Sequence, residues 1–99
     1  MSRLVIVRPL AEQDLREAQT WYEEKQTSLG AEFRVAADAV FQQISERPLH
    51  YPLVYMQLRR AVMHRFPYLI YFRADPDHVV VVACLHSKRS PRLVKTRSR

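Results

Sequence analysis

The stretch Val79-Val80-Val81-Val82-Ala83-Cys84-Leu85 is the most hydrophobic segment of the chain and decides how the rest of it can fold. Its β-branched residues favour a strand, and an unbroken apolar run predicts a strand that is covered on both faces or nearly so. We therefore expect a central strand of a sheet, with partner strands beside it and a layer of helices packed on it.

The two segments before this run have the patterns of partner strands. Tyr68–Phe72 is aromatic and β-branched, and Ala74–Asp77 joins it to the hydrophobic run with turn residues. Leu58–Arg65 mixes apolar and basic residues, which suits a half-exposed strand, and Phe66-Pro67 marks a bend after it. Because successive strands with short links tend to pair in order, an antiparallel meander is expected.

The first half predicts a strand and a helical hairpin. Leu4–Val7 is a short β-branched run, and apolar residues then recur at helical spacing over residues 9–25. A second helix starts at Leu29, with Ser28 as its N-cap, and is expected to end before Pro48 because the residue before a proline avoids the α region. The predicted class is α+β in the order β-α-α-β-β-β, with the hairpin packed on one face of a small, mainly antiparallel sheet.

Length and composition bound the architecture and the location. With 99 residues, of which 47% are hydrophobic, the chain predicts a single domain over residues 1–99 with one core. Residues from about 92 to 99 are polar and basic, which predicts a flexible tail. Cys84 has no second cysteine to pair with, which fits a reducing cytoplasm. No apolar run approaches the length of a membrane span, so we expect a cytoplasmic protein without membrane contact.

The net charge of +6 is distributed unevenly along the chain. Residues 1–50 hold six Lys/Arg and eight Asp/Glu, a net charge of −2, whereas residues 51–99 hold ten Lys/Arg and two Asp, a net charge of +8. So basic a half predicts an anionic partner, either nucleic acid or an acidic protein, although a solvated basic surface is the alternative. The two helices are neutral to acidic on their exposed sides, which argues against insertion of a helix into the major groove of DNA.

Six segments of the chain form an ordered set: Ala11–Ala18 with Trp21-Tyr22, Leu29-Gly30 with Phe33, Pro48–Pro52, Arg59-Arg60, Arg65–Tyr71 and Leu85–Pro91. In this order they resemble the ParE/RelE superfamily of toxins from bacterial toxin–antitoxin pairs, which includes plasmid-stabilisation proteins. The similarity extends from about Arg8 to Arg97, and Val94 stands where many relatives carry a tryptophan.

This resemblance implies a toxin that a cognate antitoxin binds and silences, with operator DNA contacted only through the antitoxin. ParE-like members inhibit DNA gyrase and need no catalytic residues, whereas RelE-like members cut mRNA on the ribosome. A third possibility is a degenerate toxin that survives only as an antitoxin-binding co-repressor.

Cleavage of RNA without a metal needs a base that takes the proton of the 2′-hydroxyl, a cation that stabilises the charge of the phosphorane, and an acid that protonates the leaving oxygen. RelE-like nucleases tend to carry an arginine three residues before the tyrosine that matches Tyr71, and this chain has Tyr68 at that position. Some of these nucleases also end in a His-Tyr pair, and the aligned residues here are Ser87-Lys88. His86 is one residue away from that pair, and one residue along a strand places a side chain on the opposite face. The candidates for a nuclease are Arg60, Arg65, His86, Lys88 and Arg89, with His64, Tyr68 and Tyr71 as further ones.

We therefore favour a gyrase-inhibiting toxin that acts by binding, with the mRNA endoribonuclease as the alternative. The four histidines have no ligand spacing and the only glycine is Gly30, so neither a metal nor another cofactor is expected. The residues predicted to contact the target or the antitoxin are Arg59, Arg60, Arg65, Tyr68, His86, Arg89, Arg92 and Arg97.

Overall fold

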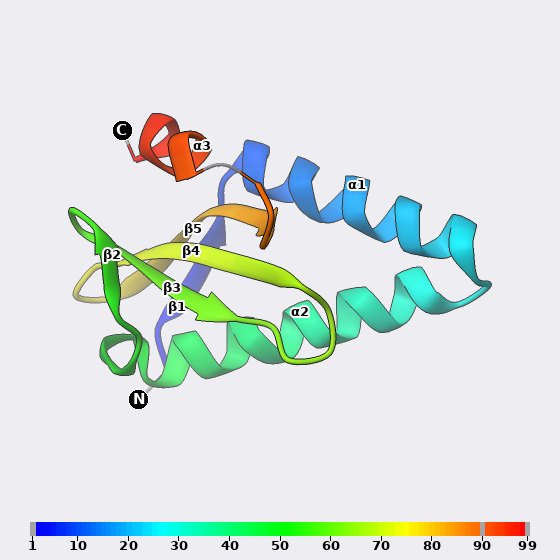
Figure 1. Cartoon of the computed structure of the whole chain (residues 1–99). Coiled ribbons are helices and arrows are strands. Elements are labelled where there is room, and N and C mark those ends of the chain that lie inside the picture. Colours follow the sequence, from blue (N-terminus) through cyan, green and yellow to red (C-terminus); the bar gives the residue numbers. More distant parts are fainter. Residues whose placement is uncertain (1, 90, 99) are drawn as a thin grey trace.

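The structure of the chain is a computed structural model that describes residues 2–89 and 91–98, and its helices and strands follow the predicted order with additions (Figure 1). The α+β class and the arrangement of one strand, two helices and a meander are confirmed. In chain order the elements are β1 (Leu4–Val7), α1 (Pro9–Lys25), α2 (Leu29–Glu46), the 3-10 helix η1 (Pro48–His50), β2 (Leu53–Tyr55), β3 (Leu58–Val62), β4 (Tyr68–Ala74), β5 (His78–His86) and α3 (Pro91–Arg97).

The sheet has the strand order β1-β5-β4-β3-β2, so the hydrophobic run Val79–Leu85 lies in an interior strand as predicted. Strand β5 pairs in parallel with β1 and antiparallel with β4. Every residue from Val79 to Leu85 is buried, because α1 and α2 cover one face of the sheet and α3 packs against the other.

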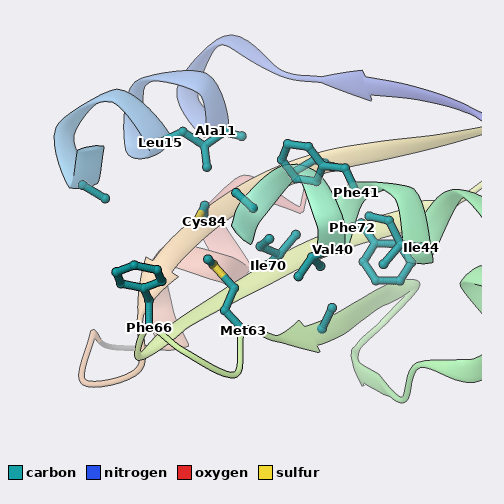
Figure 2. Packing of buried hydrophobic residues seen from close by; sticks show 14 of the residues in the cluster. Ala11, Leu15, Val40, Phe41, Ile44, Met63, Phe66, Ile70, Phe72 and Cys84 are labelled. Carbon is teal, nitrogen blue, oxygen red and sulfur yellow. The ribbon is translucent and has the colours of Figure 1, made fainter. Parts of the chain in front are cut away.

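The larger core lies between the helical hairpin and the sheet. Figure 2 shows Ile44 of α2 next to Phe72 of β4, with Ile70 of β4 in the middle of the cluster and Leu15 of α1 nearer Cys84 of β5. All five side chains are buried, and each large apolar side chain removed from water contributes about 1.5–3 kcal/mol to folding. The hairpin is therefore held by its apolar faces, which the sequence periodicity predicted.

The second face of the sheet carries a smaller core, and the helix that covers it was not predicted from the sequence. The tail expected from about residue 92 forms most of α3 instead, and Val94 is 4% exposed against Leu58, Tyr71 and Val82. The helix forms because Leu93 and Val94 cover apolar strand residues that would otherwise face water. Val94 is thus a core position.

The turn between α1 and α2 differs from its expected capping. Ser28 precedes α2 as predicted, but its backbone is left-handed, with φ of 76°, and its side chain makes no cap hydrogen bond. Glu23 caps the helix in its place, since its carboxylate accepts the Ser28 N–H at 2.8 Å and the Gly30 N–H at 3.0 Å. A carboxylate at this position also complements the positive end of the α2 dipole.

Strand β3 is shorter than the segment Leu58–Arg65 that predicted it. It ends at Val62, and the Met63 N–H donates to the Tyr68 carbonyl at 3.0 Å, which closes the turn around Pro67. A further short strand, β2, pairs antiparallel with β3 at the sheet edge. Among the residues that the structure describes, no helix combines the length and hydrophobicity needed to cross a membrane.

Candidate functional site

A cleft of about 460 Å³ opens between α1 and the neighbouring ends of β4 and β5. It forms where the side chains on one side of α1 face the turn before β4 and the chain that leaves β5. Its lining residues are Asp14, Glu17, Ala18, Trp21 and Tyr22 from α1, and Pro67, Tyr68, Cys84, Leu85, His86 and Arg89 from the sheet side.

Tyr68 is the centre of the aromatic wall of this cleft. The strand register places it opposite His86, with the two rings edge to face at 5.3 Å, and its ring lies 5.1 Å from that of Phe33. Burial raises the pKa of the Tyr68 phenol above its ordinary value, and only the nearby Arg89 acts in the other direction. The phenol therefore keeps its proton at neutral pH and meets a ligand as a hydrogen-bond donor.

His86 is oriented by the backbone that follows it. The Lys88 N–H donates to His86 Nδ1 at 3.1 Å, so the neutral ring carries its proton on Nε2. In this state the lone pair of Nδ1 already accepts the Lys88 N–H. His86 is thus arranged as a donor, and it would have to break the Lys88 bond to accept a proton through Nδ1.

Asp14 lies at the floor of the cleft and links it to α3. Its carboxylate accepts the Cys84 N–H at 3.0 Å and forms a two-pronged ion pair with the Arg97 guanidinium, with Nη2 3.0 Å from Oδ1. Both side chains are largely buried, at 12% and 14% exposure. Asp14 is not among the residues predicted for the site. Its spacing from Ala11 and Leu15 places it near the apolar side of α1, and a carboxylate in that position indicates a partly buried acid with a partner.

The rim of the cleft is the exposed end of α1. The Trp21 side chain is 52% exposed, its ring meets that of Tyr22 at 5.0 Å, and the Lys25 ammonium lies 4.8 Å from the centre of the indole. Glu17 on the same helix is bonded by the Gln13 amide at 2.9 Å. An exposed tryptophan beside charged groups is typical of protein-binding surfaces.

The structure brings only part of the predicted site set together. Tyr68, His86 and Arg89 line the cleft, and Lys88 touches it through the backbone bond to His86. Arg97 reaches the floor from α3 as the ion-pair partner of Asp14, while Arg92 is exposed on the same helix.

The remaining predicted arginines and aromatics lie outside the cleft. Arg65 is bonded to Glu32 of α2 at 2.6 Å, and Arg59 donates to the Tyr51 carbonyl at 2.7 Å. Arg60 is on the α3 side of the sheet, opposite Tyr71. Arg65 is thus paired with α2 and is not among the residues that line the cleft. His64 is exposed in the turn after β3.

No group of His, Cys, Asp and Glu within residues 2–89 and 91–98 has the geometry of a metal site. Cys84 is buried, and burial raises the pKa of its thiol to about 12. The cleft therefore offers hydrogen-bond donors, aromatic rings and two carboxylates, without an activated nucleophile.

The chain is similar to known toxins in sequence and in structure. Residues 5–91 match the model of a protein family described as the ParE toxin of the type II toxin–antitoxin system parDE. No curated protein sequence matches the chain.

Two solved structures share the fold. One is from the chromosomal ParDE toxin–antitoxin system of P. aeruginosa, with a TM-score of 0.65, 13% identity, and coverage of 86% of this chain and 96% of that one. The other is from a RelBE toxin–antitoxin complex of Mycobacterium tuberculosis, with a TM-score of 0.60, 21% identity, and coverage of 87% of this chain and 99% of that one.

Proposed function

Because the chain belongs to the ParE toxin family of type II toxin–antitoxin systems, we propose that it arrests growth by binding and inhibiting DNA gyrase, and that a cognate antitoxin neutralises it. Both similar solved structures come from toxin–antitoxin systems, which supports a protein antitoxin as partner. The +8 charge of residues 51–99 favours an acidic surface on that antitoxin.

One observation supports action by binding instead of by RNA cleavage: most cleft groups that could serve as a general base are already engaged, and Glu17 accepts a bond from the Gln13 amide. Asp14 is ion-paired with Arg97, His86 Nδ1 accepts the Lys88 N–H, and the Tyr68 phenol has a raised pKa. A general base needs an available lone pair within reach of the proton that it removes.

The charges of the cleft support the same proposal. Asp14 and Glu17 line it together with Arg89, and Arg97 neutralises Asp14 from below, so the cleft has no excess of positive charge to attract a phosphate group. Trp21 at the rim and the exposed Arg89 on the sheet side of the cleft are, in contrast, residue types that contribute strongly to protein–protein binding. We therefore assign the target contact to this rim.

The test is a gyrase supercoiling assay with the purified chain, free of antitoxin. Stoichiometric toxin is expected to block supercoiling, and Trp21→Ala is expected to weaken the inhibition by about tenfold or more, as for a binding hot spot. Leu49→Ala is the matched control, since Leu49 is also exposed, at 64%, but lies in η1, outside the cleft.

Full supercoiling activity in an excess of toxin would overturn the gyrase proposal. Primer extension on translated mRNA separates the alternatives: cuts linked to codons would favour the ribonuclease. Growth that is unaffected by expression without any antitoxin would instead favour a co-repressor that has lost its toxicity.

A further inference from the structure

Three hydrogen-bond donors line the sheet side of the cleft, and no acceptor of the described chain engages them. They belong to Tyr68 and His86, whose half-buried rings lie 5.3 Å apart, and to the exposed Arg89. Within residues 2–89 and 91–98, no hydrogen bond or ion pair is formed by the Tyr68 phenol, by His86 Nε2 or by the Arg89 guanidinium. We call Tyr68, His86 and Arg89 the donor corner. All three residues line the open cleft, so a ligand can reach them and replace the water there.

The donor corner offers protons and has little capacity to accept them. A guanidinium has N–H groups and no acceptor. The Lys88 N–H occupies His86 Nδ1 at 3.1 Å, which leaves the Nε2–H to donate. Burial raises the pKa of the Tyr68 phenol, so the phenol also carries its proton at neutral pH. The matching ligand is therefore an acceptor, and the charge of Arg89 favours an anionic one.

The acids of the cleft do not fill this role. The Asp14 carboxylate is engaged by the Arg97 guanidinium and by the Cys84 N–H at 3.0 Å. Glu17 comes from the α1 wall and accepts the Gln13 amide at 2.9 Å. These acids also balance the cations around the cleft, so a ligand is selected by directed hydrogen bonds at short range and not by long-range attraction.

We propose that the donor corner binds a carboxylate, and that this carboxylate is an aspartate or glutamate side chain on the surface of the target protein. The two oxygens of a carboxylate offer about four lone-pair positions, enough for a two-pronged bond from Arg89 together with bonds from Tyr68 and His86. The rings of Trp21 and Tyr22 line the cleft from α1, where they can cover the aliphatic stem of that side chain. The inference rests on the proposed function in one respect, since it takes the target to be a protein that docks at the rim.

A nucleic acid is a poorer match, although each phosphate diester also carries one negative charge. Its strand brings a charge with every nucleotide, and the exposed surface of α1 next to the cleft carries Glu17 and Glu24. A polypeptide can instead present one carboxylate among uncharged neighbours, so it satisfies the donor corner without bringing further charges toward these acids.

The direct test follows the His86 ring nitrogens in an NMR titration of the full chain. In the free chain their chemical shifts should show the proton on Nε2, and a proton on Nδ1 would remove one donor and contradict the proposal. The probe is the peptide acetyl-Ala-Ala-Glu-Ala-Ala-amide, and the control is the same peptide with glutamine in place of the glutamate. The glutamate peptide is expected to shift the Nε2 signal saturably and to bind about tenfold tighter than the control, as for one charge-assisted contact. Equal binding of the two peptides would overturn the proposal.

Two small anions identify the kind of anion and its source. Acetate should bind more weakly than the glutamate peptide, because it has no stem or backbone to contact the aromatic rings. Acetate that binds as tightly as the peptide would replace the protein side chain by a free carboxylate as the ligand. Dimethyl phosphate, which has the charge and the oxygens of the nucleic-acid backbone, should also bind more weakly, and tighter binding would overturn the proposal in favour of nucleic acid.

Substitutions in the donor corner connect this binding to the named side chains. Arg89→Gln should lower the affinity for the glutamate peptide by about tenfold, and Tyr68→Phe by about threefold, since it removes the hydroxyl and keeps the ring packed against Phe33. Lys95→Gln is the matched control, because it removes one positive charge from an exposed position of α3 outside the cleft and should leave the affinity unchanged. An equal loss in Arg89→Gln and Lys95→Gln would mean that overall charge governs binding, which contradicts a defined site. Circular dichroism spectra that match the wild type show that the variants are folded.

The carboxylate site and the proposed target fail separately. A wild-type chain that binds the glutamate peptide but does not inhibit gyrase would overturn the target and leave the site standing. A chain that inhibits gyrase but ignores the peptide would overturn the site and leave the target standing. When both proposals hold, Arg89→Gln should weaken gyrase inhibition about as much as it weakens peptide binding, whereas Lys95→Gln should not.

Discussion

Substitution of Gly30 by alanine is the sharpest test of the helical hairpin. Gly30 is buried in the first turn of α2, and a Cβ built there would lie 2.5 Å from the Gln19 carbonyl oxygen and 3.0 Å from the Glu23 side chain. The carbonyl belongs to the backbone of α1, so it cannot move aside as a flexible side chain would. Alanine therefore forces α1 and α2 apart at this contact.

The magnitude follows from opposing contributions. Alanine at a helical position is favoured over glycine by about 1 kcal/mol through propensity alone. Overpacking against a fixed backbone costs about 1–3 kcal/mol. The Glu23 cap is disturbed as well, and hydrogen bonds to a charged group contribute about 1.5–3 kcal/mol each. We expect a net loss of about 2 kcal/mol, which corresponds to a fall in Tm of about 10 °C for a domain of this size.

Urea unfolding followed by circular dichroism measures this loss. Ala39→Gly, at an exposed position of α2, is the control and should lose about 1 kcal/mol through propensity. If Gly30→Ala were instead stabilised by about 1 kcal/mol, propensity alone would govern the site and the close approach of the helices would be refuted.

Three further predictions concern groups inside the fold. Cys84 should resist a disulfide reagent at pH 8 in the folded chain and react fully in denaturant, because burial raises the pKa of its thiol to about 12. Asp75→Asn should lower the urea midpoint most at neutral pH, where the Asp75 carboxylate is charged. The pKa of Asp75 is lowered, chiefly because Arg73 donates a hydrogen bond to the charged carboxylate. The loss of stability should therefore shrink as the pH falls below about 4 and the wild-type carboxylate becomes protonated. An effect of Asp75→Asn that is equal at pH 7 and pH 2 would contradict this. Arg97→Ala should cost about 3 kcal/mol by leaving Asp14 buried without its cation, and a double-mutant cycle with Asp14→Ala should be clearly non-additive.

The elements that could be predicted from the sequence are those whose pattern depends on burial. The hydrophobic run Val79–Leu85 is confirmed as an interior strand, and α1 over Pro9–Lys25 has the predicted bounds. Helix α2 ends at Glu46, ahead of Pro48, for the steric reason that predicted it. In each case the local signal and the tertiary burial favour the same structure.

The missed features depend on contacts between distant residues. Helix α3 gave no amphipathic signal long enough to recognise, because its stability comes from Val94 against the sheet and from Arg97 bonded to Asp14, 83 positions earlier. The Glu23 cap was missed since the side chain reaches forward from another helix, whereas capping rules consider the residue next to the helix. Single-sequence periodicity contains no information about either contact.

The candidate site was predicted in its residue types more than in its grouping. Alternation along β3 places Arg59 and Arg60 on opposite faces of the sheet, and in the structure Arg59 is bonded to the Tyr51 carbonyl while Arg60 lies on the side of α3. The cleft and Arg60 consequently belong to different sides of the sheet, with α3 packed on the side of Arg60 and bonded through Arg97 to the floor of the cleft. Helix α3 is therefore the element that links the two faces, and it does so through contacts between residues that are far apart in the sequence.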